Sequence, residues 1–236
     1  MDESITVDFR EPMPVLALPG FVMLPHAVQP LHIFEPRYRQ VVARCMEAED
    51  GPVHIAMATY AGERELAVGA KRGRLRPAVC VGQIVRGATL PDGRSNILVH
   101  GVCRGRIVEV LEPRGERLYH EAMVVPIERD PSAVPAMPGL RERLRELIAG
   151  PQLSRMNTAR AIVEWLDRDD VPTHALLEIV GFALVRDEKL RYRLLEEPTP
   201  QGRARLVRAE LTRLVRLVAK ADEQNWRDWP KGLSWN

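Results

Sequence analysis

The spacing of hydrophobic and polar positions changes part-way along the chain. Up to about residue 127, short apolar runs separated by turn residues favour strands, at 14–18, 28–34, 53–59, 78–88, 95–99, 102–111 and 118–127. Asp92-Gly93 supplies a tight hairpin turn between two of them. One helix is expected among the strands, from Pro36 to about Ala48, because it begins with a proline and its apolar residues recur at helical spacing.

Beyond residue 139 the apolar residues follow helical spacing throughout. The expected helices have apolar stripes beginning at Leu140 and Ala161, a largely apolar and therefore central segment at 173–185, and a short segment capped by Asp187. The second stripe consists of Ala161, Ile162, Trp165 and Leu166. A long last helix is expected after Thr199-Pro200, with four arginines on its outward face, Arg203, Arg208, Arg213 and Arg216.

These patterns predict an α+β protein in which a β-barrel or folded sheet with one helix is followed by an α-helical bundle. The predicted division is a β-rich domain at 1–129, a proline-rich linker at 130–139, the bundle at 140–221 and a tail at 222–236. The tail contains Trp226, Trp229 and Trp235, which are expected to dock back on the protein, with capture of a partner as the alternative.

Composition and charge narrow the functional classes. Lys+Arg 34 against Asp+Glu 32 gives a net charge of +2, which does not indicate a polyanion partner. The three cysteines, Cys45, Cys80 and Cys103, fit neither a disulfide framework nor a zinc site. The acidic start lacks the features of a secretion signal, and five prolines exclude a membrane helix from the uncharged stretch 12–34. We therefore expect a cytoplasmic protein with no membrane contact.

Catalytic patterns are missing from the sequence. It contains no GxxxxGK[ST] phosphate loop and no GxSxG elbow, and its histidines have no metal-ligand spacing. His100 and Cys103 would point to opposite faces of a strand, which argues against a catalytic pair. We expect no catalytic residue, no metal and no cofactor, so the chain is predicted not to be an enzyme.

Several blocks carry a resemblance to a known family. The stretches 16–25 (LALPGFVMLP) and 31–39 (LHIFEPRYR), with weaker blocks at 81–84, 90–93, 96–99, 101–107 and 194–206, resemble the N-terminal substrate-binding domain of Lon proteases. The resemblance implies a PUA-like β-barrel followed by a helical bundle, a unit that helps Lon proteases engage unfolded polypeptide, here in the stand-alone form. Gly105 departs from the family, which often has a large apolar residue there.

The candidate binding residues are Phe34, Glu35, Arg37, Tyr38 and Arg104, and the central three place an acid, a base and a phenol together beside an apolar extended segment. A strand-to-helix corner is the alternative explanation for the central three of these. There the Glu35 carboxylate would meet free N–H groups at the helix start, and Arg37 would pair with a nearby acid or carbonyl.

The leading functional hypothesis is a binding module that holds unfolded polypeptide or a protein partner, with a protease system as one setting. An apolar groove and strand-edge pairing would supply the affinity. The alternative is an RNA-binding PUA-like protein, although residues 53–127 contain only Tyr60 and Tyr119 as aromatic side chains. An enzyme acting on a small metabolite is a third class without a recognisable site. The oligomeric state is left open by the sequence.

Overall fold

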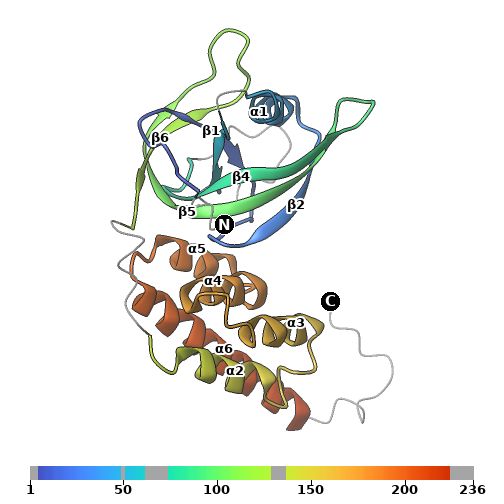
Figure 1. The fold of residues 1–236 in the computed structure, drawn as a ribbon, viewed down its shortest axis with the longest axis vertical. Coiled ribbons are helices and arrows are strands. Elements are labelled where there is room, and N and C mark those ends of the chain that lie inside the picture. Colours follow the sequence, from blue (N-terminus) through green and yellow to red (C-terminus); the bar gives the residue numbers. More distant parts are fainter. Residues whose placement is uncertain (1–4, 49–50, 62–73, 129–136, 224–236) are drawn as a thin grey trace.

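The computed structural model describes residues 5–48, 51–61, 74–128 and 137–223, which form a β-rich half and a helical half (Figure 1). The strands are β1 (Met13–Ala17), β2 (Val28–Ile33), β3 (His54–Ala58), β4 (Ala78–Thr89), β5 (Ser95–Leu111) and β6 (Glu121–Pro126). The helices are α1 (Pro36–Met46), α2 (Leu140–Ala149), α3 (Asn157–Leu166), α4 (Thr173–Leu184), α5 (Glu188–Glu196) and α6 (Pro200–Glu223). The expected α+β class is confirmed.

The strands form one folded sheet with the order β2-β5-β4-β3-β1-β6. Neighbouring strands are antiparallel except for β1 and β3, which run parallel. β5 is long enough to pair with β4 through residues 95–106 and with β6 through residues 105–111. Because β6 also pairs with β1, the pairings lead from β5 through β4, β3, β1 and β6 back to β5. Among the described strands, β2 pairs with β5 alone and lies outside this circuit.

The two faces of the sheet enter different buried clusters. One cluster fills the inside of the circuit with mostly small side chains: Met13, Val15, Ala17, Ala56, Ala58, Val79, Val81, Ala122 and Val124. The other cluster lies on the outer face, where residues such as Leu16 and Ile55 pack with α1 and with the helical half. Successive strand residues point to opposite faces, so strands buried on both sides are apolar at nearly every position.

Gly105 points into the crowded interior of the circuit. A Cβ atom at this position would lie 2.3 Å from Val124 Cγ1 and 3.3 Å from Val81 Cγ2. The departure from the family pattern at Gly105 therefore has a steric reason, since the neighbouring valines already fill the space that a larger side chain would need.

The expected break between strands 95–99 and 102–111 is wrong, because β5 runs without interruption from Ser95 to Leu111. Gly101, which lies between the two expected segments, allows a close approach of the backbone. A Cβ atom there would lie 2.4 Å from the carbonyl oxygen of Leu24, and the Gly101 N–H donates to Ala27 O over 2.9 Å. The residue thus admits the β1–β2 loop against the strand.

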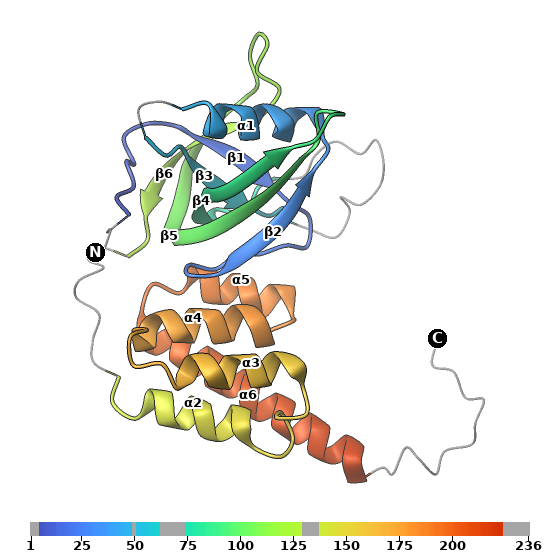
Figure 2. The same cartoon turned by 45° about the vertical axis from the view of Figure 1, so that its right-hand side comes forward.

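The helical half is organised around α4, which is buried along most of its length. It contacts α3, α5 and α6, and α2 packs against α3 and α6. α4 and α5 lie nearest the β-rich half, whereas α2 lies farthest from it (Figures 1 and 2). Asp187 accepts a hydrogen bond from the N–H of Leu190 over 2.7 Å, so the predicted cap of α5 is confirmed.

Two expectations about helix faces are wrong. Trp165 is 42% exposed, because α3 buries Ala159, Ile162 and Leu166 instead of the full predicted stripe. Arg203 is only 4% exposed, although helical spacing placed it with the outward arginines of α6. It is buried because acidic side chains from other elements neutralise it there, an arrangement that helical periodicity cannot reveal.

The domain division stays a prediction. Most of the proposed linker and nearly all of the tryptophan-containing tail lie outside the described residues, and the larger buried cluster includes residues of both halves. Among the described helices, none has the combination of length and apolar character that crossing a bilayer requires. The cytoplasmic location likewise stays a prediction.

Replacing Gly105 tests the packing inside the strand circuit. Gly105→Ala should lower the free energy of unfolding by about 1–3 kcal/mol, because the added methyl group meets Val124. In a Val124→Ala background the same substitution should cost clearly less, since the clashing Cγ1 atom is gone. Urea unfolding followed by circular dichroism measures both steps. An equal cost in the two backgrounds would contradict this steric explanation.

Candidate functional site

β2 and α1 meet at a corner that carries four of the candidate binding residues. Phe34 and Glu35 connect the two elements, and Arg37 and Tyr38 lie in the first turn of α1. The helix begins at Pro36, which has no N–H to donate and suits a first helical position. α1 lies at the end of the β-rich half that is remote from the helical half (Figures 1 and 2).

Glu35 forms an ion pair and does not cap the helix. Its Oε2 atom lies 2.7 Å from Arg37 Nη2 and accepts a hydrogen bond from Arg37 Nε over 2.9 Å. The expected contact with the free N–H groups of α1 is absent, because the side chain makes no capping hydrogen bond. The expected pairing of Arg37 with a nearby acid is confirmed.

Tyr38 anchors the corner in the core. It is 4% exposed, its hydroxyl donates to Ala17 O in β1, and the Arg37 guanidinium lies 4.3 Å from its ring centroid. Burial raises the pKa of Tyr38, and the neighbouring Tyr60 adds to the effect. A buried, uncharged phenol with its donor in use serves to hold β1 and α1 together, and offers no free group to a ligand.

Phe34 differs from its neighbours because it faces solvent. It is 62% exposed and stacks with His32, with ring centroids 6.4 Å apart. We call His32 and Phe34 the Phe34 patch. Exposed aromatic side chains beside other apolar atoms are typical of contact surfaces.

The free edge of β2 is poorly suited to strand pairing. Pro30 lies in the middle of β2 and has no N–H. A proline is tolerated in an edge strand where its nitrogen faces away from the neighbouring strand, here β5, so the free edge lacks a donor at this position. The Pro30 carbonyl oxygen already accepts a hydrogen bond from Gln29 Nε2 over 2.9 Å. The expected edge-strand pairing therefore has a poor template here, and the Phe34 patch can contribute through its side chains.

Arg104 lies in a different place, between the two halves. Its side chain is 1% exposed and donates through Nη2 to Glu178 Oε2 in α4 over 2.5 Å and through Nη1 to Glu128 Oε1 over 3.2 Å. Burial acts to lower the pKa of Arg104, but the carboxylates of Glu178 and Glu128 outweigh it and raise the pKa. Arg104 is therefore a structural cation of the seam and does not join the corner residues.

Arg203 of α6 completes this arrangement. Its Nε atom lies 2.8 Å from Glu178 Oε1, and its Nη1 atom lies 2.6 Å from Glu128 Oε1. Each carboxylate thus contacts both guanidinium groups. We call Arg104, Glu128, Glu178 and Arg203 the seam cluster. Because its formal charges cancel and its members come from both halves, it ties β5 and the end of β6 to α4 and α6.

Two histidines meet beside the seam cluster. The rings of His26 and His174 lie 5.6 Å apart, and His26 has a positive φ of 61°. Burial lowers the pKa of His26 to about 4, with further lowering from His174, His100 and Arg104 and an opposing effect from Glu128. Both rings are consequently neutral near pH 7. No group of three or more metal-ligating side chains is found in the described part of the chain.

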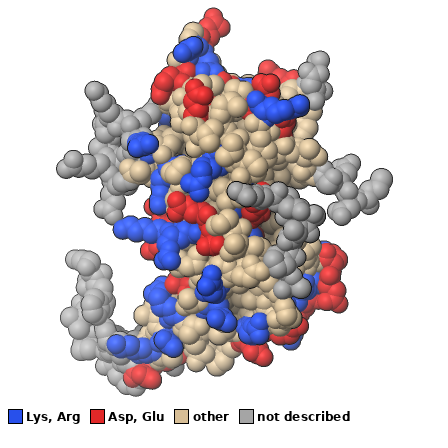
Figure 3. Space-filling model, turned by 90° about the vertical axis from the view of Figure 1, so that its left-hand side faces the viewer, with Lys and Arg blue, Asp and Glu red and all other residues tan. Residues whose placement is uncertain are grey.

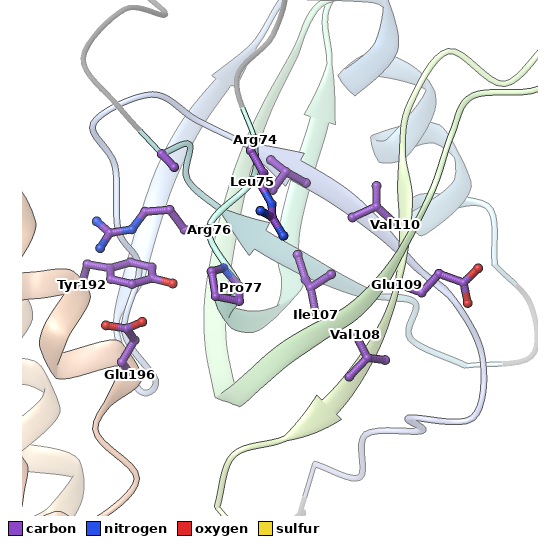
Figure 4. Close-up of a pocket in the computed structure, with 11 residues that line it drawn as sticks. Arg74, Leu75, Arg76, Pro77, Ile107, Val108, Glu109, Val110, Tyr192 and Glu196 are labelled. Carbon is purple, nitrogen blue, oxygen red and sulfur yellow. The ribbon is translucent and has the colours of Figure 1, made fainter.

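A pocket of about 650 Å³ opens where the β-rich half meets α5. Residues 74–77 form one wall and residues 107–110 another, while Tyr192 and Glu196 of α5 close one end (Figure 4). Arg76 lies over the Tyr192 ring at 3.3 Å, and the Tyr192 hydroxyl accepts a hydrogen bond from the N–H of Ala78 over 2.8 Å. The pocket combines apolar walls with a few charged groups, as ligand sites usually do.

The surface charge is mixed around the seam. On the face shown in Figure 3, Lys and Arg alternate with Asp and Glu over both halves. Interspersed charges of this kind do not produce the basic stripe that phosphate backbones require. This face thus gives no support to a nucleic-acid surface.

Comparison with known proteins identifies the family. The family model described as the ATP-dependent protease La (LON) substrate-binding domain matches residues 12–213. The chain belongs to the LON substrate-binding domain family. A comparison with curated protein sequences gave no match. The resemblance predicted from blocks such as 31–39 is confirmed by this match.

Solved structures of LON domains have the same fold. The N-terminal domain of the Lon protease of the Mycobacterium avium complex has a TM-score of 0.63 and 18% sequence identity, covering 86% of this chain and 98% of that chain. A Lon N-terminal domain protein from Xanthomonas campestris has a TM-score of 0.58 and 18% identity, covering 84% and 98% of the two chains. At this identity the comparison establishes the architecture of the LON domain alone.

Sequence reasoning missed several residues of the LON domain's seam. Glu178 gave a signal that could have been used, because it is the one charged residue in the otherwise largely apolar helix α4, and a buried acid needs a basic partner. Glu128 and Arg203 gave no comparable signal, since their partners lie far away in the sequence.

Removing one member of the seam cluster should be costly. Arg104→Met is expected to lower the free energy of unfolding by about 3–5 kcal/mol, because Glu178 would stay buried with an incomplete set of partners. Arg94→Met is the matched control, since its pair with Asp92 is exposed to solvent and should contribute little to stability. Urea unfolding compares them, and equal losses would contradict a special role for the seam cluster.

The histidine pair predicts a loss of stability in acid. Unfolding returns His26 from a pKa of about 4 to 6.5, so the unfolded chain binds the proton first and stability falls as pH drops from 6.5 towards 4. The full effect is about 3 kcal/mol. His26→Asn should reduce the difference in free energy of unfolding between pH 7 and pH 4.5, because the titrating ring is gone. Asn is chosen because it tolerates the positive φ of this position, and urea unfolding at the two pH values is the measurement. If the free energy of unfolding changed with pH equally in the wild type and in His26→Asn, His26 would not be the source of the acid instability.

Proposed function

We propose that this LON domain is a non-catalytic module that binds unfolded polypeptide or an exposed segment of a protein partner. The observation that carries the proposal is the Phe34 patch, where an aromatic side chain of the family-specific block 31–39 is 62% exposed on a rigid corner. Such a side chain costs stability in water and gains it on contact with apolar groups of a partner.

The corner residues have separate roles in this proposal. Phe34 makes the contact, whereas Glu35, Arg37 and Tyr38 hold the backbone that presents it. Arg104 acts at a distance by fixing the helical half against the sheet. Binding would therefore depend directly on Phe34 and indirectly on the other four candidates.

The architecture proposed with this function is a PUA-like barrel at 1–129 followed by the helical bundle at 140–221. The circuit of strand pairings supports the barrel, and the change of element type after β6 supports the division. A cytoplasmic setting alongside an ATP-dependent protease fits a family whose members include domains of such enzymes.

Phe34→Ser should weaken binding to unfolded polypeptide. Partial loss of apolar burial predicts about 1–2 kcal/mol, which is roughly a 5- to 30-fold increase in Kd. The measurement is fluorescence anisotropy with labelled, reduced and carboxymethylated lactalbumin. Trp165→Ser is the matched control, because it removes another exposed aromatic side chain from the far half, and it should leave Kd unchanged.

A salt series separates this function from RNA binding. Apolar and main-chain contacts should give a Kd for lactalbumin that changes little between low and moderate salt, whereas contacts to phosphate weaken steeply. Salt-sensitive binding of a labelled single-stranded RNA, with no binding of lactalbumin, would overturn the proposal in favour of an RNA-binding protein.

A further inference from the structure

The last part of β5 has an open backbone edge. β5 pairs with β4 as far as Arg106, and the N–H of Ile107 then donates to Pro77 O over 2.8 Å. From Glu109 to Leu111 the strand pairs with β6 on its other side, and Val108 lies at a β-bulge in that pairing. No described residue pairs with residues 108–111 on the β4 side. Unpaired strand edges are templates for another strand.

The pocket in Figure 4 lies along this open edge. Val108, Glu109 and Val110 form its wall on β5, and residues 74–77 stand opposite. Neighbouring strands in a sheet are about 4.8 Å apart, so a pocket of about 650 Å³ next to the edge can hold an extended chain. The open edge and the pocket thus form one continuous site.

The side chains around the edge suit a polypeptide. Leu75, Pro77 and Ile107 provide apolar contact, while Arg74 and Glu109 place opposite charges on facing walls. Neither of these two charged residues has an ion-pair partner among the described residues. Opposite charges match the mixed side chains and dipolar backbone of a polypeptide, whereas a polyanion would be repelled by the acid.

The free edge of β2 is a poorer template for an added strand than the open edge of β5. The free edge of β2 is interrupted by Pro30, whose carbonyl oxygen already has a donor. Residues 108–111 contain no proline, and Val108 and Val110 favour extended structure. Of these two edges, that of β5 is the better template for an added strand, because no proline interrupts it.

We propose that unfolded polypeptide binds as an added strand along Val108–Leu111, with an apolar side chain in the pocket against Leu75 and Ile107. This inference rests on the proposed function and adds a second contact for the bound chain, because the pocket borders α5 whereas Phe34 lies at the corner remote from the helical half. Hydrogen bonds to the main chain require no particular side chain, so many sequences can bind. Unfolded chains are favoured over folded proteins, because most main-chain groups of a folded protein are already paired.

Backbone methylation of a peptide tests the added strand. The probe is a labelled peptide of alternating valine and threonine with terminal lysines, prepared also with N-methyl groups on the odd or on the even residues. In a strand, alternate N–H groups face the same neighbour, so one methylated form should bind at least about 10-fold more weakly and the other within about 2-fold of the parent. Equal Kd values for the two methylated forms would overturn the inference.

Variants on the edge locate the site. Val108→Lys and Val110→Lys change residues that are 60% and 37% exposed, so both proteins should fold, and each should bind the peptide at least about 5-fold more weakly. Val85→Lys on β4, at a residue that is 49% exposed and does not line the pocket, is the matched control and should bind normally. Normal binding by the edge variants would overturn the inference.

Amide hydrogen exchange gives a readout that does not depend on any substitution. Saturating peptide should slow exchange at residues 108–111 in the wild-type protein, and unchanged exchange there would overturn the added strand. If lactalbumin binds with Phe34-dependent affinity while these edge tests fail, the proposed function stands and this inference falls. If neither lactalbumin nor the peptide binds, both fall together.

Discussion

The buried ion pairs of the seam cluster determine how the two halves of this LON domain are joined. Arg104 and Arg203 each contact both Glu128 and Glu178. Removing any one of the four side chains would therefore leave a charged group at the seam without all of its partners. Apolar packing also joins the halves, through the larger buried cluster, but the hydrophobic effect itself has no preferred direction. The charge-assisted hydrogen bonds from Arg104 to Glu128 and Glu178 add a directional contact across the seam.

The pocket beside α5 depends on this arrangement. Its walls belong to the β-rich half and its end is closed by Tyr192 and Glu196 of the helical half, so its shape changes if the halves move. The hydrogen bond from Ala78 to the Tyr192 hydroxyl reinforces the contact from the start of β4. A stable seam therefore has a consequence for binding, although none of its charged members reaches the proposed strand site.

The sequence predicted features that depend on neighbours along the chain. The hairpin at Asp92-Gly93, the cap at Asp187 and the proline at the start of α1 have signals within a few residues, and the structure contains all three. Features set by distant partners were missed or misjudged. The break expected between residues 99 and 102 is bridged by a strand in which Gly101 admits the Leu24 carbonyl. Arg203 was expected to face solvent, but Glu128 and Glu178 lie beside it. The same limit applies to the open edge, which exists because β5 leaves β4 and continues with β6.

Strand edges explain why a binding module of this kind need not aggregate. An exposed edge that accepts any extended chain would also accept a second copy of itself. In this LON domain the accessible edge of β2 is interrupted by Pro30, whereas the open stretch of β5 is short and lies along a pocket with charged residues on its facing walls. A bare extended segment can enter such a site more easily than the edge of a folded sheet, whose neighbouring strands would collide with the walls. Selectivity for unfolded chains then follows from the shape around the edge, without a requirement for particular side chains.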